Sequence, residues 1–209
     1  MPILISETEV KLERADLDRR IVLARDVDPT TGLIVPPARR PGLHLSGLLK
    51  YIAEVSKVTA RLQEIADEEY PLRWLMGHAV EEFLASLYPL MVWQPGEVVD
   101  PVIMNPDGVS FEELDGPNEQ VIEEFKHNRS KRYDGREFLT KKWLFKHQGM
   151  GYCLGYGARF VRWHVLYSME WPDPVYVKYL YQFTDEDLAG MRRIVDSNRD
   201  AAIRRGYAE

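Results

Sequence analysis

The chain is poor in cysteine and in long apolar runs. Its 209 residues include one cysteine, Cys153, which excludes an internal disulfide and any zinc or iron–sulfur site with four cysteine ligands. No apolar run approaches the roughly 20 residues that a helix needs to span a bilayer. The N-terminal segment also lacks the basic start and apolar block of a secretory signal. We therefore expect a protein of the reducing cytoplasm that does not associate with a membrane.

Acidic charge dominates the chain as a whole but not its middle. The net charge is −6, while the stretch from Lys126 to His147 contains eight basic and two acidic residues. A basic strip beside an acidic site suits an approaching phosphate backbone, although such a run is commonly a solvated helix face. The residues that we expect to contact DNA are Arg129, Lys131, Arg132, Lys141, Lys142, Lys146 and Tyr152.

The first 42 residues differ in character from the rest. Residues 1–25 are charged and irregular, and residues 26–42 are rich in proline and glycine, which is typical of a surface loop or arm. We therefore predict an N-terminal arm and loop over residues 1–42, followed by one domain over residues 43–209. The length and a hydrophobic content of 45% suit one globular domain with a sizeable core.

Hydrophobic periodicity and breaker residues predict a mixed succession of helices and strands. Helices are expected over residues 46–70, with Ser46 as the cap, and over 71–87, 136–156 and 185–205. Strands are expected over residues 91–93, 98–104, 109–111, 120–126, 160–167 and 175–183. This order predicts a single domain of the α/β or α+β class.

Two carboxylates and a lysine are expected to meet at the end of one strand. Asp107 lies in a Pro-Asp-Gly turn, and the breakers that follow allow the chain to fold back beside Glu124. Glu124 and Lys126 share one face of the strand because side chains repeat every two residues, and Phe125 points to the other face. Such a group can hold Mg²⁺ and activate a water against a phosphodiester. Each part alone is commonly structural, as a plain turn aspartate or a strand-edge pair; the combination favours a site.

Two predicted helices offer further candidates. Glu81, four residues after Gly77, is the candidate third carboxylate ahead of His78, the alternative being a solvent-exposed glutamate. Gln148 and Tyr152 stack on one helix face at positions i and i+4. Gln148 could bond the water, a metal ligand or a DNA phosphate, whereas Tyr152 could equally serve the core. Three glycines weaken this helix, so we expect a close approach there by another helix or by DNA.

Taken together, four motifs resemble the PD-(D/E)XK nuclease superfamily. The resemblance is closest to the lambda-exonuclease-like (YqaJ-type) viral recombinases, with the RecB-like exonucleases next, and it covers about residues 45–185. The motifs are Gly77-x-x-x-Glu81, Pro106-Asp107-Gly108, Glu124-Phe125-Lys126 and Gln148-x-x-x-Tyr152.

The resemblance implies a restriction-endonuclease-like core, a central mixed sheet flanked by helices, and hydrolysis of DNA with Mg²⁺ or Mn²⁺. By position, Asp107 and Glu124 would be metal ligands and Lys126 would activate the water. Glu81 would be an auxiliary acid and Gln148 a helper, and the carbonyl of Phe125 could add a metal ligand.

Two departures bear on the choice of subgroup. RecB-like relatives often place histidine where Glu81 stands, and some carry a four-cysteine iron–sulfur cluster that this chain cannot form, so the viral side is favoured. The acidic hairpin over residues 112–119 is an addition that could lie near the DNA and lower the affinity, or serve a partner.

The leading hypothesis is an exonuclease that trims duplex ends for phage or prophage recombination in a bacterial host. A homotrimer and a single-strand annealing partner follow by family analogy only. Two alternatives stay open: a metal-dependent endonuclease of the same fold, and a non-catalytic DNA-binding or assembly module.

Overall fold

The computed structural model describes residues 2–12, 40–56, 71–93, 95–99, 101–128, 132, 134–168 and 174–208. The helices are α2 (Leu45–Val55), α3 (Pro71–Ser86), α4 (Gly135–Lys141), α5 (Trp143–Tyr156) and α6 (Asp185–Arg204). The strands are β1 (Ile3–Val10), β2 (Val92–Trp93), β3 (Val98–Val99), β4 (Ile103–Met104), β5 (Gly108–Glu112), β6 (Glu119–Asn128), β7 (Phe160–Tyr167) and β8 (Val175–Gln182).

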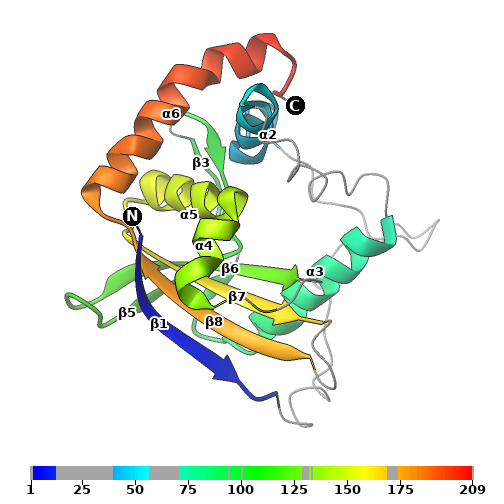
Figure 1. Cartoon of the computed structure of the whole chain (residues 1–209), viewed down its shortest axis with the longest axis vertical. Coiled ribbons are helices and arrows are strands. Elements are labelled where there is room, and N and C mark those ends of the chain that lie inside the picture. The colour runs from blue at the N-terminus through cyan, green and yellow to red at the C-terminus, as the bar shows by residue number, and fades with distance from the viewer. Residues whose placement is uncertain are drawn as a thin grey trace.

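A mixed sheet forms the centre of the fold (Figure 1). Its strand order is β1-β8-β7-β6-β5-β2. β6 and β7 run parallel, and the other neighbouring pairs are antiparallel. The parallel pair needs a crossover connection, which α4 and α5 supply. The predicted class, a mixed sheet flanked by helices, is therefore confirmed.

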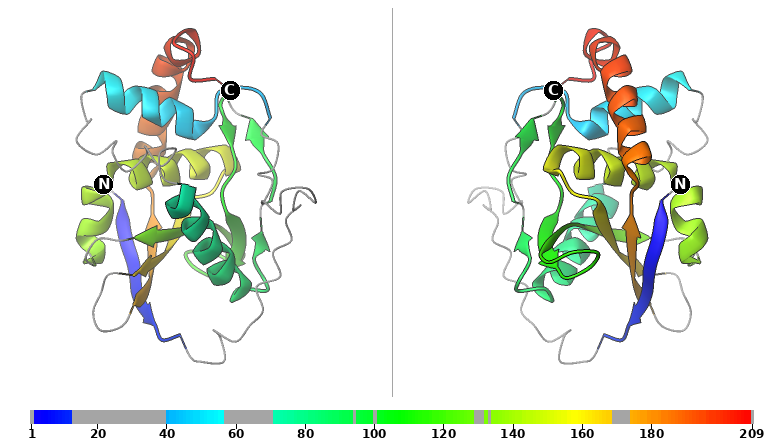
Figure 2. Two further views of the ribbon diagram at one scale, coloured as in Figure 1. Left: turned by 90° about the vertical axis from the view of Figure 1, so that its right-hand side faces the viewer. Right: turned by 90° about the vertical axis from the view of Figure 1, so that its left-hand side faces the viewer.

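Helices cover both faces of this sheet (Figures 1 and 2). On one face, α5 lies against the sheet, with α2 and α6 beyond it. On the other face, Leu84 of α3 packs with Phe125 of β6 and Tyr176 of β8. The arrangement has three layers, and the residues of β6 alternate between the two cores, since Ile122 belongs to the α5 side.

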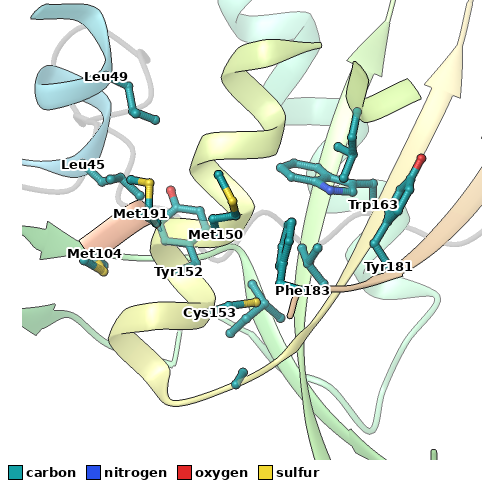
Figure 3. Close-up of a cluster of buried hydrophobic side chains, with 14 of the residues drawn as sticks. Leu45, Leu49, Met104, Met150, Tyr152, Cys153, Trp163, Tyr181, Phe183 and Met191 are labelled. Atoms are coloured by element: carbon teal, nitrogen blue, oxygen red, sulfur yellow. The ribbon is translucent and has the colours of Figure 1, made fainter. Parts of the chain in front are cut away.

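The larger core lies between the sheet and α5 (Figure 3). Close packing there depends on a glycine of α5. A Cβ atom at Gly151 would lie 2.5 Å from Cδ2 of the buried Leu45 in α2. The close approach expected at this helix is thus made by another helix. At Gly77 of α3, by contrast, a Cβ would meet nothing within 4 Å among the described residues.

The N-terminal segment departs from the prediction of an irregular arm. Residues 3–10 form β1, which pairs antiparallel with β8 at one edge of the sheet. Polar and apolar residues do not alternate regularly in β1. An edge strand is solvated on much of its surface, so it does not need the regular alternation that predicts a strand. The start of the chain therefore belongs to the sheet, while most of the predicted arm, residues 13–39, lies outside the described residues.

Three predicted elements have different bounds. The first helix starts at Leu45 after His44, so Ser46 is no cap, and it ends at Val55; residues 57–70 lie outside the described part. The helix predicted over 136–156 is broken at Lys142, whose backbone (φ −107°, ψ 73°) leaves the helical region. The strand predicted over 98–104 is a separate small hairpin of β3 and β4.

The remaining predictions hold closely. The β5–β6 hairpin, β7, β8 and α3 lie where the pattern places them. Thr184 and Asp187 form a reciprocal cap at the start of α6, where the sequence pattern places the helix; each side chain bonds the other's backbone N–H. None of the helices in the described ranges is both long and apolar enough to cross a membrane.

Candidate active site

The β5–β6 hairpin brings Asp107 beside Glu124. Gly108 pairs with Glu123 in the antiparallel register, so the residue before β5 lies next to Glu124. The Asp107 N–H donates to Oε1 of Glu124 at 3.2 Å. In return, Oδ2 of Asp107 accepts from the N–H of Phe125 at 2.8 Å. The two acids are thus fixed to each other by backbone and side chain, as the breakers in the sequence predicted.

Lys126 completes the group. Its Nζ lies 3.0 Å from Oε2 of Glu124 and 3.5 Å from Oδ2 of Asp107. The Glu124 side chain is 1% exposed, whereas Lys126 and Asp107 are 18% and 25% exposed. The Glu124 carboxylate is therefore buried, whereas a ligand can contact Lys126 and Asp107 from solvent.

Electrostatics in this group favour an added cation. Burial and the neighbouring Asp107 raise the pKa of Glu124 to about 8. Burial also raises the pKa of Asp107, against the lowering effect of Lys126. The pKa of Lys126 rises well above its usual value because both carboxylates outweigh the desolvation of the ammonium. The group has two carboxyl groups and one ammonium, so it lacks one positive charge when both acids are ionised.

Glu81 of α3 belongs to the same electrostatic neighbourhood. Its charge raises the pKa of Asp107 and of Lys126. The helix that carries it packs on the opposite face of the sheet from α5. Because its charge acts on both Asp107 and Lys126, Glu81 lies near the group. The side chain of the alternative candidate, His78, lies outside the described residues.

Gln148 and Tyr152 of α5 face the group from the other layer. Nε2 of Gln148 donates to the Tyr152 hydroxyl at 3.0 Å, which confirms the predicted i, i+4 pair. Burial raises the pKa of Tyr152, and the charge of Glu124 adds to that shift. Tyr152 is also part of the large core (Figure 3), so its expected packing role is confirmed as well.

The donor set can be tested against a divalent metal. Among the described residues, no cluster of three or more His, Cys, Asp or Glu side chains is arranged to hold a metal ion. Oε2 of Glu124, however, is buried, and the Lys126 ammonium at 3.0 Å is its partner there. The carbonyl of Phe125 lies on the Asp107 side of β6, because the N–H and C=O of one strand residue point the same way. Two carboxylates and a carbonyl are hard oxygen donors that fit Mg²⁺ or Mn²⁺.

Several described residues of the basic strip after Lys126 have partners outside this group. Arg132 pairs with Glu7 and Glu9 of β1, at 2.8 and 2.6 Å, at the sheet edge three strands from β6. Lys141 pairs with Glu137 within α4, and Lys142 is buried with its ammonium over the Phe145 ring.

Lys146 and the first residues of the strip complete this comparison. Lys146 stands two residues before Gln148 and so points to a different face of α5. Arg129 and Lys131 lie outside the described residues. The predicted strip therefore divides between the β1 edge, a helix surface and a buried helix junction.

The acidic hairpin is tied back to the sheet. Glu112 pairs with Arg162 of β7 at 2.5 Å, and Asp115 accepts from Gln182 of β8. Part of its charge is therefore neutralised within the domain.

Sequence reasoning missed the residues that surround the group. Trp163 of β7 pairs with Glu124 in the parallel register, and Nζ of Lys126 lies 5.9 Å from the centre of a Trp163 ring. On the opposite face, Glu123 is buried against His164. A glutamate before Glu124 in an apolar strand was the available signal; its partners depend on a register that the sequence does not reveal.

No family model matches the sequence, and neither a curated protein nor a solved structure matches it. The function is therefore inferred from the motifs and geometry of this chain.

Proposed function

We propose that the chain is a metal-dependent deoxyribonuclease that hydrolyses phosphodiester bonds from the ends of duplex DNA. The observation that carries the proposal is the convergence of Asp107, Glu124 and Lys126. A salt bridge of 3.0 Å and one of 3.5 Å join the lysine to the two acids. The Glu124 carboxylate accepts from the Asp107 N–H, and the Asp107 carboxylate accepts from the Phe125 N–H. The order of the four motifs along the chain supports the same activity.

Each residue has a distinct part in the reaction. Asp107 and Glu124, with the Phe125 carbonyl, would hold Mg²⁺ or Mn²⁺, which when bound supplies Lewis-acid activation of water and phosphate. Lys126 presents a permanent positive charge where negative charge develops on the phosphorus oxygens. Its high pKa makes it an electrostatic stabiliser and an orienting donor for the water rather than a base.

The layer formed by α5 limits access to the acids. Gln148 and Tyr152 form a bonded pair there, which places an amide oxygen and a hydroxyl on the helix that faces the site. These groups can orient a water or a phosphate without adding charge. Glu81 adds negative charge on the α3 side and so strengthens the attraction for a cation.

The biological setting extends the proposal by resemblance. End trimming for phage recombination in a bacterial cytoplasm, a homotrimer, and a single-strand annealing protein as partner all stay predictions. DNA as the substrate is supported by the motif order; the divided basic strip gives it little support.

Digestion of linear and covalently closed circular duplex DNA, each with Mg²⁺ and with EDTA, tests the proposal. We expect nucleotides to be released from the linear DNA in Mg²⁺ only, with the circle left intact. Cutting of the circle would replace the exonuclease by an endonuclease. Metal-independent loss of DNA, or no loss at all with DNA still bound, would contradict the proposed chemistry.

A further inference from the structure

A line of hydrogen bonds runs through the buried layer between the sheet and α3, on the face opposite the candidate site. The Ser110 hydroxyl donates to Oε1 of Glu123 at 2.5 Å. Oε2 of Glu123 lies 2.7 Å from Nε2 of His164, and Nδ1 of His164 lies 2.5 Å from the Tyr176 hydroxyl. That hydroxyl lies 2.7 Å from the Tyr88 hydroxyl. We call these five residues the buried relay.

The proton positions in the buried relay follow from its chemistry. The Glu123 carboxylate accepts from the Ser110 hydroxyl and lies 2.9 Å from a guanidinium nitrogen of Arg162, so it acts as an acceptor. Burial lowers the pKa of His164, which keeps the ring neutral. Nε2–H therefore donates to Glu123, and Nδ1 accepts from Tyr176. Every member then has one defined orientation.

The buried relay joins the two strands that carry the acids of the candidate site to the end of α3. Ser110 is on β5, which directly follows Asp107, and Glu123 is on β6. His164 and Tyr176 extend the line across β7 and β8. Tyr88 lies in the turn that ends α3, where its N–H donates to the Ala85 carbonyl. The five side chains thus connect β5, β6 and the helix of Glu81 through bonds made by buried groups.

His164 holds both neighbours of Glu124. It bonds the side chain of Glu123, and its ring stacks on the Phe125 ring with centroids 4.3 Å apart and planes inclined by 18°. The Phe125 N–H is the donor to Asp107. A shift of the imidazole would therefore be passed directly to the backbone on each side of the buried carboxylate.

Filling a core with polar and charged groups, as the buried relay does, costs free energy of desolvation. Glu123, His164 and Tyr176 are 2%, 0% and 1% exposed, beside the apolar Leu84 and Phe125. Replacing buried ionic groups by well-packed apolar residues is often neutral or stabilising. Stability alone thus gives little reason for these residues, whereas fixed geometry on the adjacent strand positions does.

We infer that the buried relay positions Glu124 and Asp107 for metal binding and hydrolysis, acting through β6 and Phe125 rather than by contact with DNA. This inference rests on the proposed nuclease function. It assigns Glu123, His164 and Tyr176 as positioning residues, and it makes the α3 side of the sheet part of the working site.

Single hydroxyl deletions at two places in the buried relay test the inference. Tyr176→Phe removes the donor to His164, and Ser110→Ala removes the donor to Glu123; both keep most of the packing. Tyr167→Phe is the matched control, because the Tyr167 hydroxyl bonds Tyr179 at 3.1 Å and also joins β7 to β8, but in the other core. The measurements are the thermal midpoint, the Mn²⁺ dissociation constant without DNA, and kcat and KM on linear duplex DNA.

We expect both relay variants to weaken Mn²⁺ binding and lower kcat by about tenfold or more, as loss of residues supporting metal ligands commonly does, with KM little changed. Tyr167→Phe should lower the thermal midpoint by a similar amount and leave kcat and Mn²⁺ binding within about twofold of wild type. Wild-type kcat and Mn²⁺ affinity in both relay variants would overturn the inference. A wild-type protein that neither cleaves DNA nor binds Mn²⁺ would instead overturn the proposed function.

Discussion

Glu124 is the residue at which stability and the proposed chemistry oppose each other. Its carboxyl is buried, Asp107 lies beside it, and these two effects raise its pKa although Lys126 lies 3.0 Å from its Oε2. Such strain is expected where a site is arranged for a ligand rather than for the folded state alone.

Glu124→Gln should stabilise the metal-free protein, and more so at high pH. The folded-state pKa of Glu124 is raised to about 8, so wild-type stability is lost as pH rises from the unfolded-state pKa through about 8. The amide does not ionise, so the thermal midpoint of the variant should exceed that of wild type at pH 9 by more than at pH 6. Each kcal/mol corresponds to about 2–4 °C.

Glu113→Gln is the matched control for that comparison, since Glu113 is exposed on the β5–β6 loop. It should change the midpoint little at either pH. A Glu124→Gln variant that is less stable than wild type at pH 9 would show that Lys126 compensates Glu124 fully.

Metal binding should release a proton from the same group. Below about pH 8 the Glu124 carboxyl is mostly protonated, and a metal ligand must lose its proton. Mn²⁺ affinity should therefore rise between pH 6 and pH 8, by up to about tenfold per pH unit. Calorimetry in buffers of different ionisation enthalpy measures the proton count. An affinity that is flat across this range would refute the ligand role of Glu124.

At the residue scale, the three central residues could be predicted because the information is local. Asp107 is placed by a turn, and Glu124 and Lys126 share a face by strand alternation. The contacts of Lys126 with Trp163 and of Glu123 with His164 could not be predicted. They depend on the parallel register of β6 and β7, two strands that are joined by the long crossover through α4 and α5.

At the element scale, α5 is positioned by small residues on the face that meets α2. A Cβ atom at Gly151 would meet three atoms of Leu45 within 3.3 Å, and Leu45 is 1% exposed and cannot move into solvent. Because α5 carries Gln148 and Tyr152, its distance from the sheet also sets how far these side chains lie from the acids.

Gly151→Ala should destabilise the protein by roughly 1–2 kcal/mol, because overpacking outweighs the gain in helix propensity. Gly77→Ala is the matched comparison in α3, where an added Cβ meets no described atom; it should be neutral or stabilising by up to about 1 kcal/mol. Denaturant unfolding of both variants measures the difference. Equal stability of the two would contradict the packing assigned to α2 and α5.

Element bounds were predictable where one strong local signal marks them. Thr184 and Asp187 fixed the start of α6, and Pro71 the start of α3. The break at Lys142 and the strand at residues 3–10 were not predictable from local signals. The first is imposed by packing of α4 on the sheet. The second is imposed by pairing with β8, whose partner residues lie between 166 positions (Val10 to Tyr176) and 179 positions (Ile3 to Gln182) further along the chain.

At the scale of the whole molecule, the fold places the candidate site between its layers. The acids lie where β5 begins beside β6, and α5 and α3 lie on opposite faces of the sheet (Figures 1 and 2). The charge of Glu81 in α3 acts on Asp107. The fold class was predictable from the order of elements. The sheet order was not, because it depends on pairings between distant segments such as β1 and β8.

The rate of nucleotide release from linear duplex DNA in Mg²⁺, compared between wild type, Lys126→Ala and Lys50→Ala, tests the central claim most directly. Lys50 is an exposed lysine of α2 with no part in the site. We expect Lys126→Ala to lose at least about 10²–10³-fold in rate, the usual effect of removing a charge-stabilising donor, while folding normally and with Lys50→Ala unchanged. Wild-type rates in Lys126→Ala would contradict the assignment of the site.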